Sequence, residues 1–206
     1  GITSGTFGID QTIVISGEND ATFDYSINGG SSWTRGGGTT ISAEGSYSIT
    51  ARQIDKADNT SDGSSVIILV IDKTKPSVTD VSSDTANDYY NEGKAISIKV
   101  RFSEEVYVTG APKITLETGG TDRDALFAYG SGTNTLTFLY TVQSGDTAVD
   151  LNYISTSALS LNGGSIKDAV GNDANLGLPS PGSVNSLGGN KNIVIDTTAP
   201  LAPTVS

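Results

Sequence analysis

The chain has 206 residues and a net charge of −11, and it contains no cysteine, histidine or methionine. It can therefore form no disulfide, no zinc site built on thiolate or imidazole, and no Ser-His-Asp or Cys-His catalytic centre. The negative charge repels nucleic acid and anionic membrane surfaces and attracts cations, and no apolar run approaches the length of a membrane helix. We expect neither a nucleic-acid partner nor membrane insertion by this segment.

Short β-branched runs, separated by Gly, Asn, Asp and Ser, succeed one another along the chain, which is typical of an all-β protein. In Ala95–Phe102, apolar side chains alternate with polar ones, as in a half-buried strand. Asn28-Gly29 and Asn162-Gly163 indicate tight turns, and no stretch has a helical period. In chain order, the predicted strands are Thr12–Ser16, Thr22–Ile27, Ser46–Ala51, Val66–Ile71, Ala95–Phe102, Lys113–Glu117, Ala125–Tyr129, Thr135–Val142, Ser157–Leu161 and Asn192–Ile195.

An internal repeat divides the chain. Asp55-Lys-Ala-Asp-Asn59 precedes Val70-Ile-Asp-Lys-Thr-Lys-Pro76, and Asp168-Ala-Val-Gly-Asn172 precedes Val194-Ile-Asp-Thr-Thr-Ala-Pro200. Proline cannot donate to a β-ladder, so each copy ends a strand and begins a connector. We predict two tandem domains, at residues 1–73 and 74–197, and we read residues 198–206 as the start of a connector to a next domain of a longer protein.

These motifs, with Tyr25-Ser-Ile-Asn-Gly-Gly30 and Phe102-Ser-Glu-Glu-Val106, resemble the tandem immunoglobulin-like repeats of giant bacterial surface adhesins, including biofilm-associated and RTX-type proteins. The resemblance covers nearly the whole chain. It implies two tandem immunoglobulin-like β-sandwich domains that form a monomeric extender segment, stiffened by Ca²⁺ at the interdomain junction. It also implies a secreted parent protein at the bacterial cell surface that supports adhesion or biofilm formation.

One departure from the family pattern lies in the first Asp-x-x-x-Asn loop. Asp58 stands where the pattern usually has glycine, as at Gly171. Glycine adopts a left-handed conformation without steric cost, whereas aspartate tolerates it less well. We therefore expect the first loop to bend or bind differently from the second.

Acidic and amide side chains predict a calcium site at the first connector. In a seven-strand sandwich the loops segregate to two poles, which brings Glu104, Asp168 and Asn172 towards Asp72. Calcium takes six to eight oxygen ligands, and such side chains supply them, whereas magnesium keeps more of its waters. Glu105 is as plausible a ligand as Glu104 from sequence.

Further acidic turns extend this prediction. Glu18 and Glu44 are expected to face the same junction from the first domain, and Asp55 with Asn59 forms a half-site that needs a preceding connector. By the same logic, a second site is predicted at the Asp196 connector. Its expected contributors are Asp84, Asn87, Asp88, Asp146 and Asp150. In the competing interpretation, all of these residues only cap turns through their own backbone.

Enzyme activity is not expected. A glycosidase needs two carboxylates across a cleft, usually with aromatic platforms, and Trp33 is the only tryptophan. Gly36-Gly37-Gly38 lacks the lysine and the adjoining helix of a phosphate loop. The main alternative to an extender is a module of the same kind of adhesin that binds a peptide or glycan. The expected partners are neighbouring domains of the same chain and, through other parts of the parent protein, a host- or cell-surface ligand.

Overall fold

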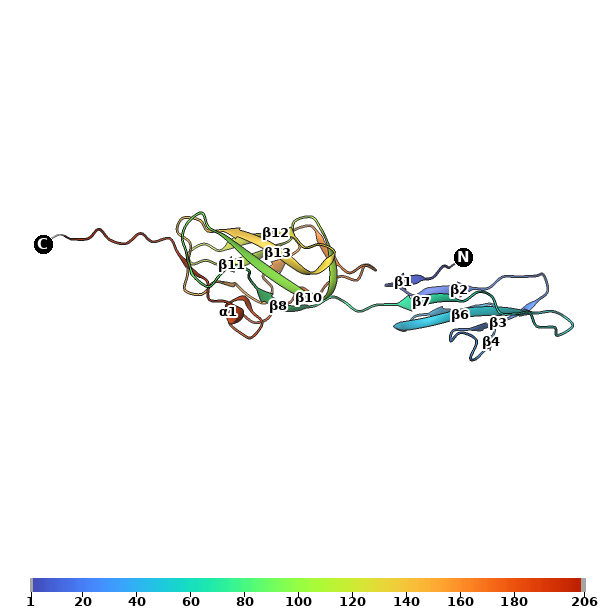
Figure 1. Cartoon of the computed structure of the whole chain (residues 1–206). Helices are drawn as coiled ribbons and strands as arrows, with labels where there is room; N and C mark the ends of the chain where they lie inside the picture. The colour runs from blue at the N-terminus through green and yellow to red at the C-terminus, as the bar shows by residue number, and fades with distance from the viewer. Residues whose placement is uncertain (1, 205–206) are drawn as a thin grey trace. The chain divides into compact units, whose positions relative to one another are not determined.

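The computed structural model describes residues 2–204, and the chain divides into two compact units, Gly1–Thr74 and Lys75–Ser206 (Figure 1). With 46% of residues in strands and 2% in a helix, the predicted all-β class is confirmed. Over the described range, the only helix is α1 (Leu187–Asn190), and no helix there is long and apolar enough to cross a membrane.

The first unit consists of two sheets. The larger has the strand order β1-β7-β6-β3-β4, with β1 parallel to β7, and the smaller pairs β2 with β5. The strands are β1 (Gly5–Phe7), β2 (Gln11–Val14), β3 (Thr22–Ser26), β4 (Thr34–Arg35), β5 (Gly38–Ile41), β6 (Gly45–Ile54) and β7 (Ile67–Ile71).

A small apolar core lies between these two sheets. Leu69 and Ile71 are two residues apart in β7, so their side chains point to the same face of the sheet, and both are buried. They pack with Ile49 of β6 against Ile13 and Ile41 from the smaller sheet.

The second unit is larger. Its main sheet has the order β15-β11-β12-β13-β10-β17, with β8 added to β10 and β16 to β11, and a small sheet has the order β14-β18-β9. The strands are β8 (Val78–Ser82), β9 (Tyr89–Tyr90), β10 (Ala95–Thr109), β11 (Lys113–Glu117), β12 (Arg123–Tyr129), β13 (Thr133–Thr141), β14 (Thr147–Ala148), β15 (Asn152–Tyr153), β16 (Leu159–Ser160), β17 (Ser165–Lys167) and β18 (Val194–Asp196).

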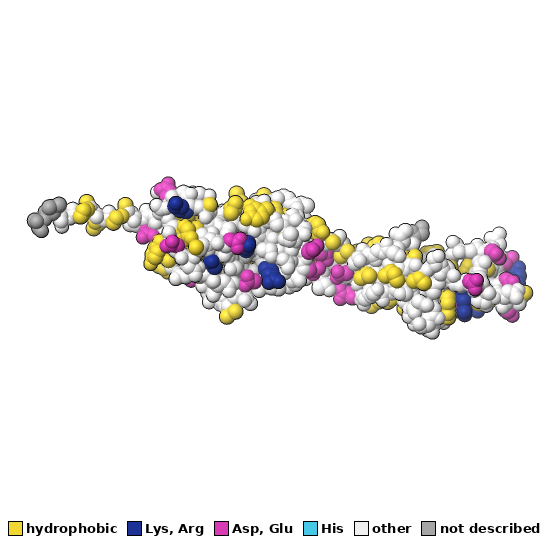
Figure 2. Space-filling view, viewed as in Figure 1, with side chains coloured by type: hydrophobic (Ala, Val, Ile, Leu, Met, Phe, Trp, Pro, Cys, Tyr) yellow, Lys and Arg dark blue, Asp and Glu magenta, His cyan; other side chains and the backbone are white. Residues whose placement is uncertain are grey.

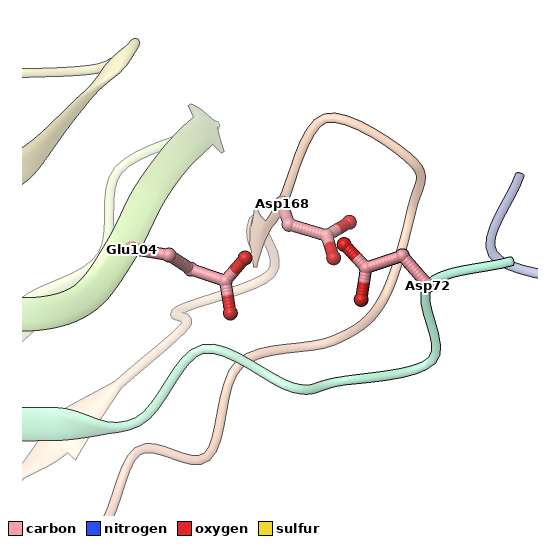
Figure 3. Close-up of side chains that lie close together, drawn as sticks. All are labelled: Asp72, Glu104 and Asp168. Atoms are coloured by element: carbon pink, nitrogen blue, oxygen red, sulfur yellow. The ribbon is translucent and has the colours of Figure 1, made fainter. Parts of the chain in front are cut away.

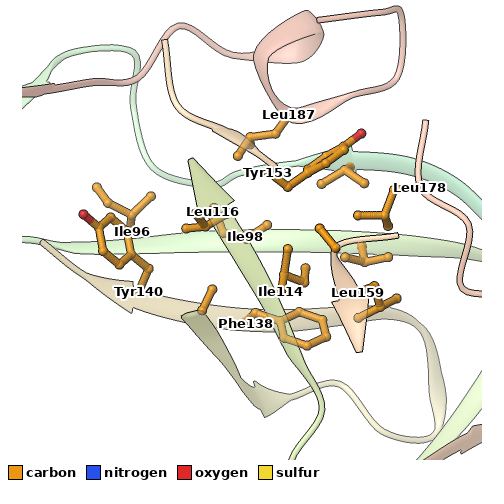
Figure 4. Packing of buried hydrophobic residues seen from close by; sticks show 14 of the residues in the cluster. Ile96, Ile98, Ile114, Leu116, Phe138, Tyr140, Tyr153, Leu159, Leu178 and Leu187 are labelled. Atoms are coloured by element: carbon orange, nitrogen blue, oxygen red, sulfur yellow. The ribbon is translucent and has the colours of Figure 1, made fainter. Parts of the chain in front are cut away.

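The core of the second unit confirms the alternation predicted for Ala95–Phe102. Ile96 and Ile98 of β10 are fully buried and belong to the same cluster as Leu116 of β11 and Phe138 of β13 (Figure 4). The segment before β18 closes the cluster with Leu178 and Leu187, the latter from α1. This core holds the strand ends, and the loops attached to them, in fixed positions.

Candidate metal site

The loop from Asp168 to Asn172 is fastened by the side chain of Asp168. One carboxylate oxygen of Asp168 accepts hydrogen bonds from the backbone N–H of Val170 at 2.9 Å and of Asn172 at 2.8 Å. The other accepts from Nδ2 of Asn172 at 2.8 Å. The predicted Asp and Asn therefore bind each other, and Asp168, itself buried, is held in place directly after β17.

Glu104 lies in an irregular stretch of β10. The pairing of β10 with β13 shifts register between Arg101 and Val106, and the strand there bonds to the segment before β8 through Ser103 N–H and Ser77 O at 2.8 Å. Glu104 is half-buried and Glu105 is exposed. This difference distinguishes the two glutamates, which are equal candidates by sequence.

Asp72 comes directly after β7, on the connector that leads into the second unit. Its N–H donates to the carbonyl of Phe7 at 3.0 Å, and its carboxylate accepts from the N–H of Thr74 at 3.1 Å. Glu44 fastens the same connector, because its carboxylate accepts from Lys73 N–H at 2.7 Å and from Thr74 Oγ1 at 2.9 Å. The backbone hydrogen bond from Lys73, with the bond from Thr74, lowers the pKa of Glu44.

Asp72, Glu104 and Asp168 each offer one carboxylate oxygen, and these oxygens all lie within 4.8 Å of one another (Figure 3). At that separation, each pair of negative charges repels by about 1 kcal/mol even at the dielectric constant of water. A cation placed among the oxygens would reverse the sign of the interaction. The all-oxygen chemistry of the cluster suits a hard cation such as Ca²⁺, which uses carboxylates, carbonyls and water as ligands.

The loop from Asp55 to Asn59 repeats the hydrogen bonds of the Asp168 loop. Asp55 accepts from Ala57 N–H at 2.8 Å, from Asn59 N–H at 2.9 Å and from Asn59 Nδ2 at 2.8 Å. The bonds from Asn59, side chain first and then backbone, lower the pKa of Asp55. Asp58 has φ 63° and Gly171 has φ 97°, so both loops use the left-handed region. The expectation that Asp58 bends its loop differently is therefore wrong.

Glu18 does not lie near Asp72, and that prediction is wrong. Its N–H donates to Oε1 of Gln53 at 3.1 Å, near the end of β6, where the Glu18 turn and the Asp55 loop line one hollow. Asp72 lies beyond Ile71, which pairs with the opposite end of β6 at Gly45. A positive side chain from the Asp55 loop already faces the Glu18 turn, since Lys56 Nζ binds the carboxylate of Asp20 at 2.8 Å.

Around Asp196, the described residues form no further group of three acidic side chains like that of Asp72, Glu104 and Asp168. The carboxylate of Asp196 accepts from Thr198 N–H at 2.9 Å, in the manner of Asp72 and Thr74. Asp146, expected as a contributor, is buried instead: its oxygens accept from Arg123 Nε at 2.8 Å, Tyr140 Oη at 2.7 Å and Gln143 N–H at 2.8 Å. Asp84 binds Lys99 at 2.5 Å.

Two buried carboxylates have structural partners that the sequence analysis did not predict: Asp146 was assigned to a metal site, and Asp24 was not singled out at all. Besides Asp146, Asp24 of β3 is buried between Arg35 Nε at 2.6 Å and Arg52 Nη2 at 2.9 Å. Burial would raise the pKa of Asp24, but the hydrogen bonds from Arg52 and Arg35 outweigh it, and the pKa is lowered. Asp24 could have been noticed from the sequence, because it is an acidic residue inside the predicted strand Thr22–Ile27, where a charged side chain needs a partner.

No protein-family model matches this chain, and no match was found among curated proteins.

Proposed function

We propose that this chain is an extender segment of a large bacterial cell-surface adhesin, made of two immunoglobulin-like domains and stiffened by Ca²⁺ bound at Asp72, Glu104 and Asp168. The proposal is supported chiefly by the approach of three carboxylate oxygens to within 4.8 Å of one another. The repeated connector and the likeness to adhesin repeats support the extender role. In this role the chain acts outside the cell, carries no catalytic centre and contributes length and rigidity to adhesion or biofilm formation.

The physical basis of the stiffening is a change in the sign of the local electrostatic energy. Without a cation, the three carboxylates repel one another and favour conformations of the connector in which Asp72 moves away. A bound divalent ion attracts all three and, at a concentration 100 times its Kd, stabilises the ion-binding state by about 2.7 kcal/mol. The connector then loses conformational freedom, because Asp72 becomes a ligand.

Calorimetric titration of the full chain with CaCl₂ tests the site. We expect Asp168→Asn and Glu104→Gln to weaken Ca²⁺ binding at least tenfold, since each removes a ligand charge while keeping the shape of the side chain. Glu105→Gln is the matched control, because it removes the same charge one residue from Glu104 and should leave the affinity nearly unchanged. Equal loss in Glu104→Gln and Glu105→Gln would mean that net charge alone attracts the ion.

Small-angle scattering tests the extender role separately. We expect the wild-type chain to show a narrower distribution of dimensions with Ca²⁺ than with chelator, and Asp168→Asn to show one profile under both conditions. Superimposable wild-type profiles would exclude stiffening even if the ion binds.

A further inference from the structure

The chain contains two Asn-Gly sequences with nearly identical neighbours. They are Ile27-Asn28-Gly29-Gly30 in the first unit and Leu161-Asn162-Gly163-Gly164 in the second. Both asparagines are exposed. In an Asn-Gly sequence, the backbone nitrogen of the glycine can attack the Cγ of the asparagine, because glycine has no side chain that hinders the approach. Since sequence and exposure are matched, a difference in this reactivity between the two turns comes from their hydrogen bonds.

The reacting groups of Asn28 and Gly29 are all bound to other groups. The Oδ1 of Asn28 accepts from Ser26 Oγ at 2.8 Å and from Ser32 N–H at 2.9 Å, and its Nδ2 donates to Ser32 Oγ at 2.8 Å. The N–H of Gly29, which is the attacking group, donates to Ser48 O of β6 at 2.8 Å. Ser26 is itself buried. The reaction at Asn28 therefore has to break four hydrogen bonds.

The turn at Asn162 leaves the same groups open. The Nδ2 of Asn162 donates to Ala111 O at 3.1 Å, and its side chain makes no other hydrogen bond within the described residues. The N–H of Gly163 donates to no group in residues 2–204, and a Cβ placed on this glycine would meet no atom within 4 Å. The turn is closed by a hydrogen bond from Gly164 N–H to Leu161 O at 2.8 Å, which leaves the attacking nitrogen at its tip.

We propose that Asn162 is a site of spontaneous chemical modification in the folded chain, whereas the fold protects Asn28. The nitrogen of Gly163 loses its proton to hydroxide and forms a bond to Cγ of Asn162. The Cγ–Nδ2 bond breaks, and the nitrogen leaves as ammonia with a proton taken from water. The product is a five-membered cyclic imide. The reaction needs only water and hydroxide, and the inference depends neither on calcium nor on the extender role.

Water then opens the imide in one of two ways. Attack at Cγ gives aspartate, and attack at the backbone carbonyl carbon gives isoaspartate, whose main chain runs through the former side chain and is one carbon longer. The backbone of Gly164 lies directly against β10, since a Cβ on Gly164 would fall 2.1 Å from Thr109 O. Thr109 pairs with Ser165, the first residue of β17. We therefore expect isoaspartate to displace Gly164 and to speed the exchange of the β17 amides with solvent.

Peptide mapping by mass spectrometry tests the proposal, because each conversion replaces an NH₂ group by OH and changes the mass of one peptide. The full chain is incubated in mildly alkaline buffer, where hydroxide is available. Each hydrogen bond that must open slows the reaction by roughly fivefold, and the turn at Asn28 has more of them. We expect Asn162 to convert at least about tenfold faster than Asn28 in the folded chain.

The chain carries its own matched control. In urea both turns are unfolded, and the rates at Asn28 and Asn162 should agree because their neighbours are nearly identical. Equal rates in the folded chain, or faster conversion at Asn28, would overturn the proposal. So would an unchanged Asn162 in the folded chain after the unfolded chain has converted completely.

Anion exchange provides a second readout, since conversion makes the net charge of −11 one unit more negative. The chain is already strongly acidic, with Asp and Glu side chains visible on both units in Figure 2, so a shallow salt gradient is needed to separate the forms. Asn162→Gln, whose longer side chain disfavours the five-membered ring, should not form the later-eluting fraction; its formation at the wild-type rate would contradict the assignment. Amide exchange of β17 that is no faster in the isoaspartyl fraction would contradict the displacement of Gly164.

Discussion

At the residue scale, Asp146 is a buried carboxylate whose oxygens accept hydrogen bonds from other groups of the chain. It is 1% exposed, and its carboxylate accepts hydrogen bonds from Arg123, Tyr140 and Gln143. The backbone carbonyl of the same residue accepts from Thr197 Oγ1 at 2.9 Å, which fastens the segment after β18. Burial tends to raise the pKa of Asp146, but the hydrogen bonds from Tyr140 and Arg123 outweigh it and the pKa is lowered.

We expect Asp146→Ala to lower the free energy of unfolding of the second unit by about 3 kcal/mol, because it leaves Arg123 and Tyr140 without their acceptor. Urea unfolding monitored by circular dichroism measures the loss. Asp173→Ala is the control: Asp173 pairs with Lys167 at 2.8 Å, but its side chain is 71% exposed, and its removal should change stability little. If both variants lost the same unfolding free energy, the burial of Asp146 would not explain its contribution to stability.

The lowered pKa of Asp146 also predicts a pH dependence. A carboxylate with a lower pKa in the folded state than in the unfolded state stabilises the fold fully above the unfolded pKa, about 3.9. That stabilisation is lost as the pH falls through the folded pKa. The difference in unfolding free energy between wild type and Asp146→Asn should therefore shrink on the acid side of about pH 4. A constant difference from neutral to acid pH would show that the charge is not involved.

At the element scale, the two Asp-x-x-x-Asn loops are the same structural unit with different residues at the left-handed position. Both fasten the first carboxylate to two backbone N–H groups and to the amide of the Asn. Asp58 therefore adopts φ 63° because the loop requires it, with no glycine present. The hydrogen bonds of the loop, rather than the residue at this position, determine its shape.

Asp58 substitutions test that conclusion. We expect Asp58→Val to destabilise the first unit by about 1–2 kcal/mol, because a β-branched residue is strained at positive φ. Asp58→Gly should be tolerated, since glycine adopts this conformation freely. Thermal unfolding of both variants measures the difference. Asp62→Val, in the same segment, should show no comparable loss, and a loss as large as that of Asp58→Val would attribute the effect to the valine side chain rather than to φ.

The sequence predicted these loops, and the alternation in Ala95–Phe102, because each is a local pattern. It failed where the direction of strands mattered. β1 (Gly5–Phe7) was not predicted, since three residues with a glycine carry little strand signal. Because β1 precedes β2, β2 runs in the opposite direction from the one expected. The turn after β2, which contains Glu18, therefore lies at the other end of the unit, beside Gln53 rather than Asp72. The choice of Glu104 over Glu105 depended on a register shift that no local pattern reveals.

At the scale of the whole molecule, the two units differ strongly in core size. The buried core of the first unit consists of Ile13, Ile41, Ile49, Leu69 and Ile71, whereas the second unit buries a much larger cluster that includes residues from β8 to β18. A small domain buries a smaller fraction of its surface on folding and is correspondingly marginal. The first unit should therefore be the less stable of the two, and the chain should not unfold in a single step.

Trp33 makes this prediction measurable, because it is the only tryptophan and it belongs to the first unit, where the guanidinium of Arg52 lies 4.3 Å from its ring centroid. In chelator, tryptophan fluorescence should report a transition at lower temperature than the main calorimetric transition. Leu69→Ala, in the small core, should lower only the fluorescence transition. Leu116→Ala should lower only the later one, since each deletes a fully buried leucine. If either substitution moved both transitions together, the two units would unfold as one cooperative domain, and their division into separately folded parts would be wrong.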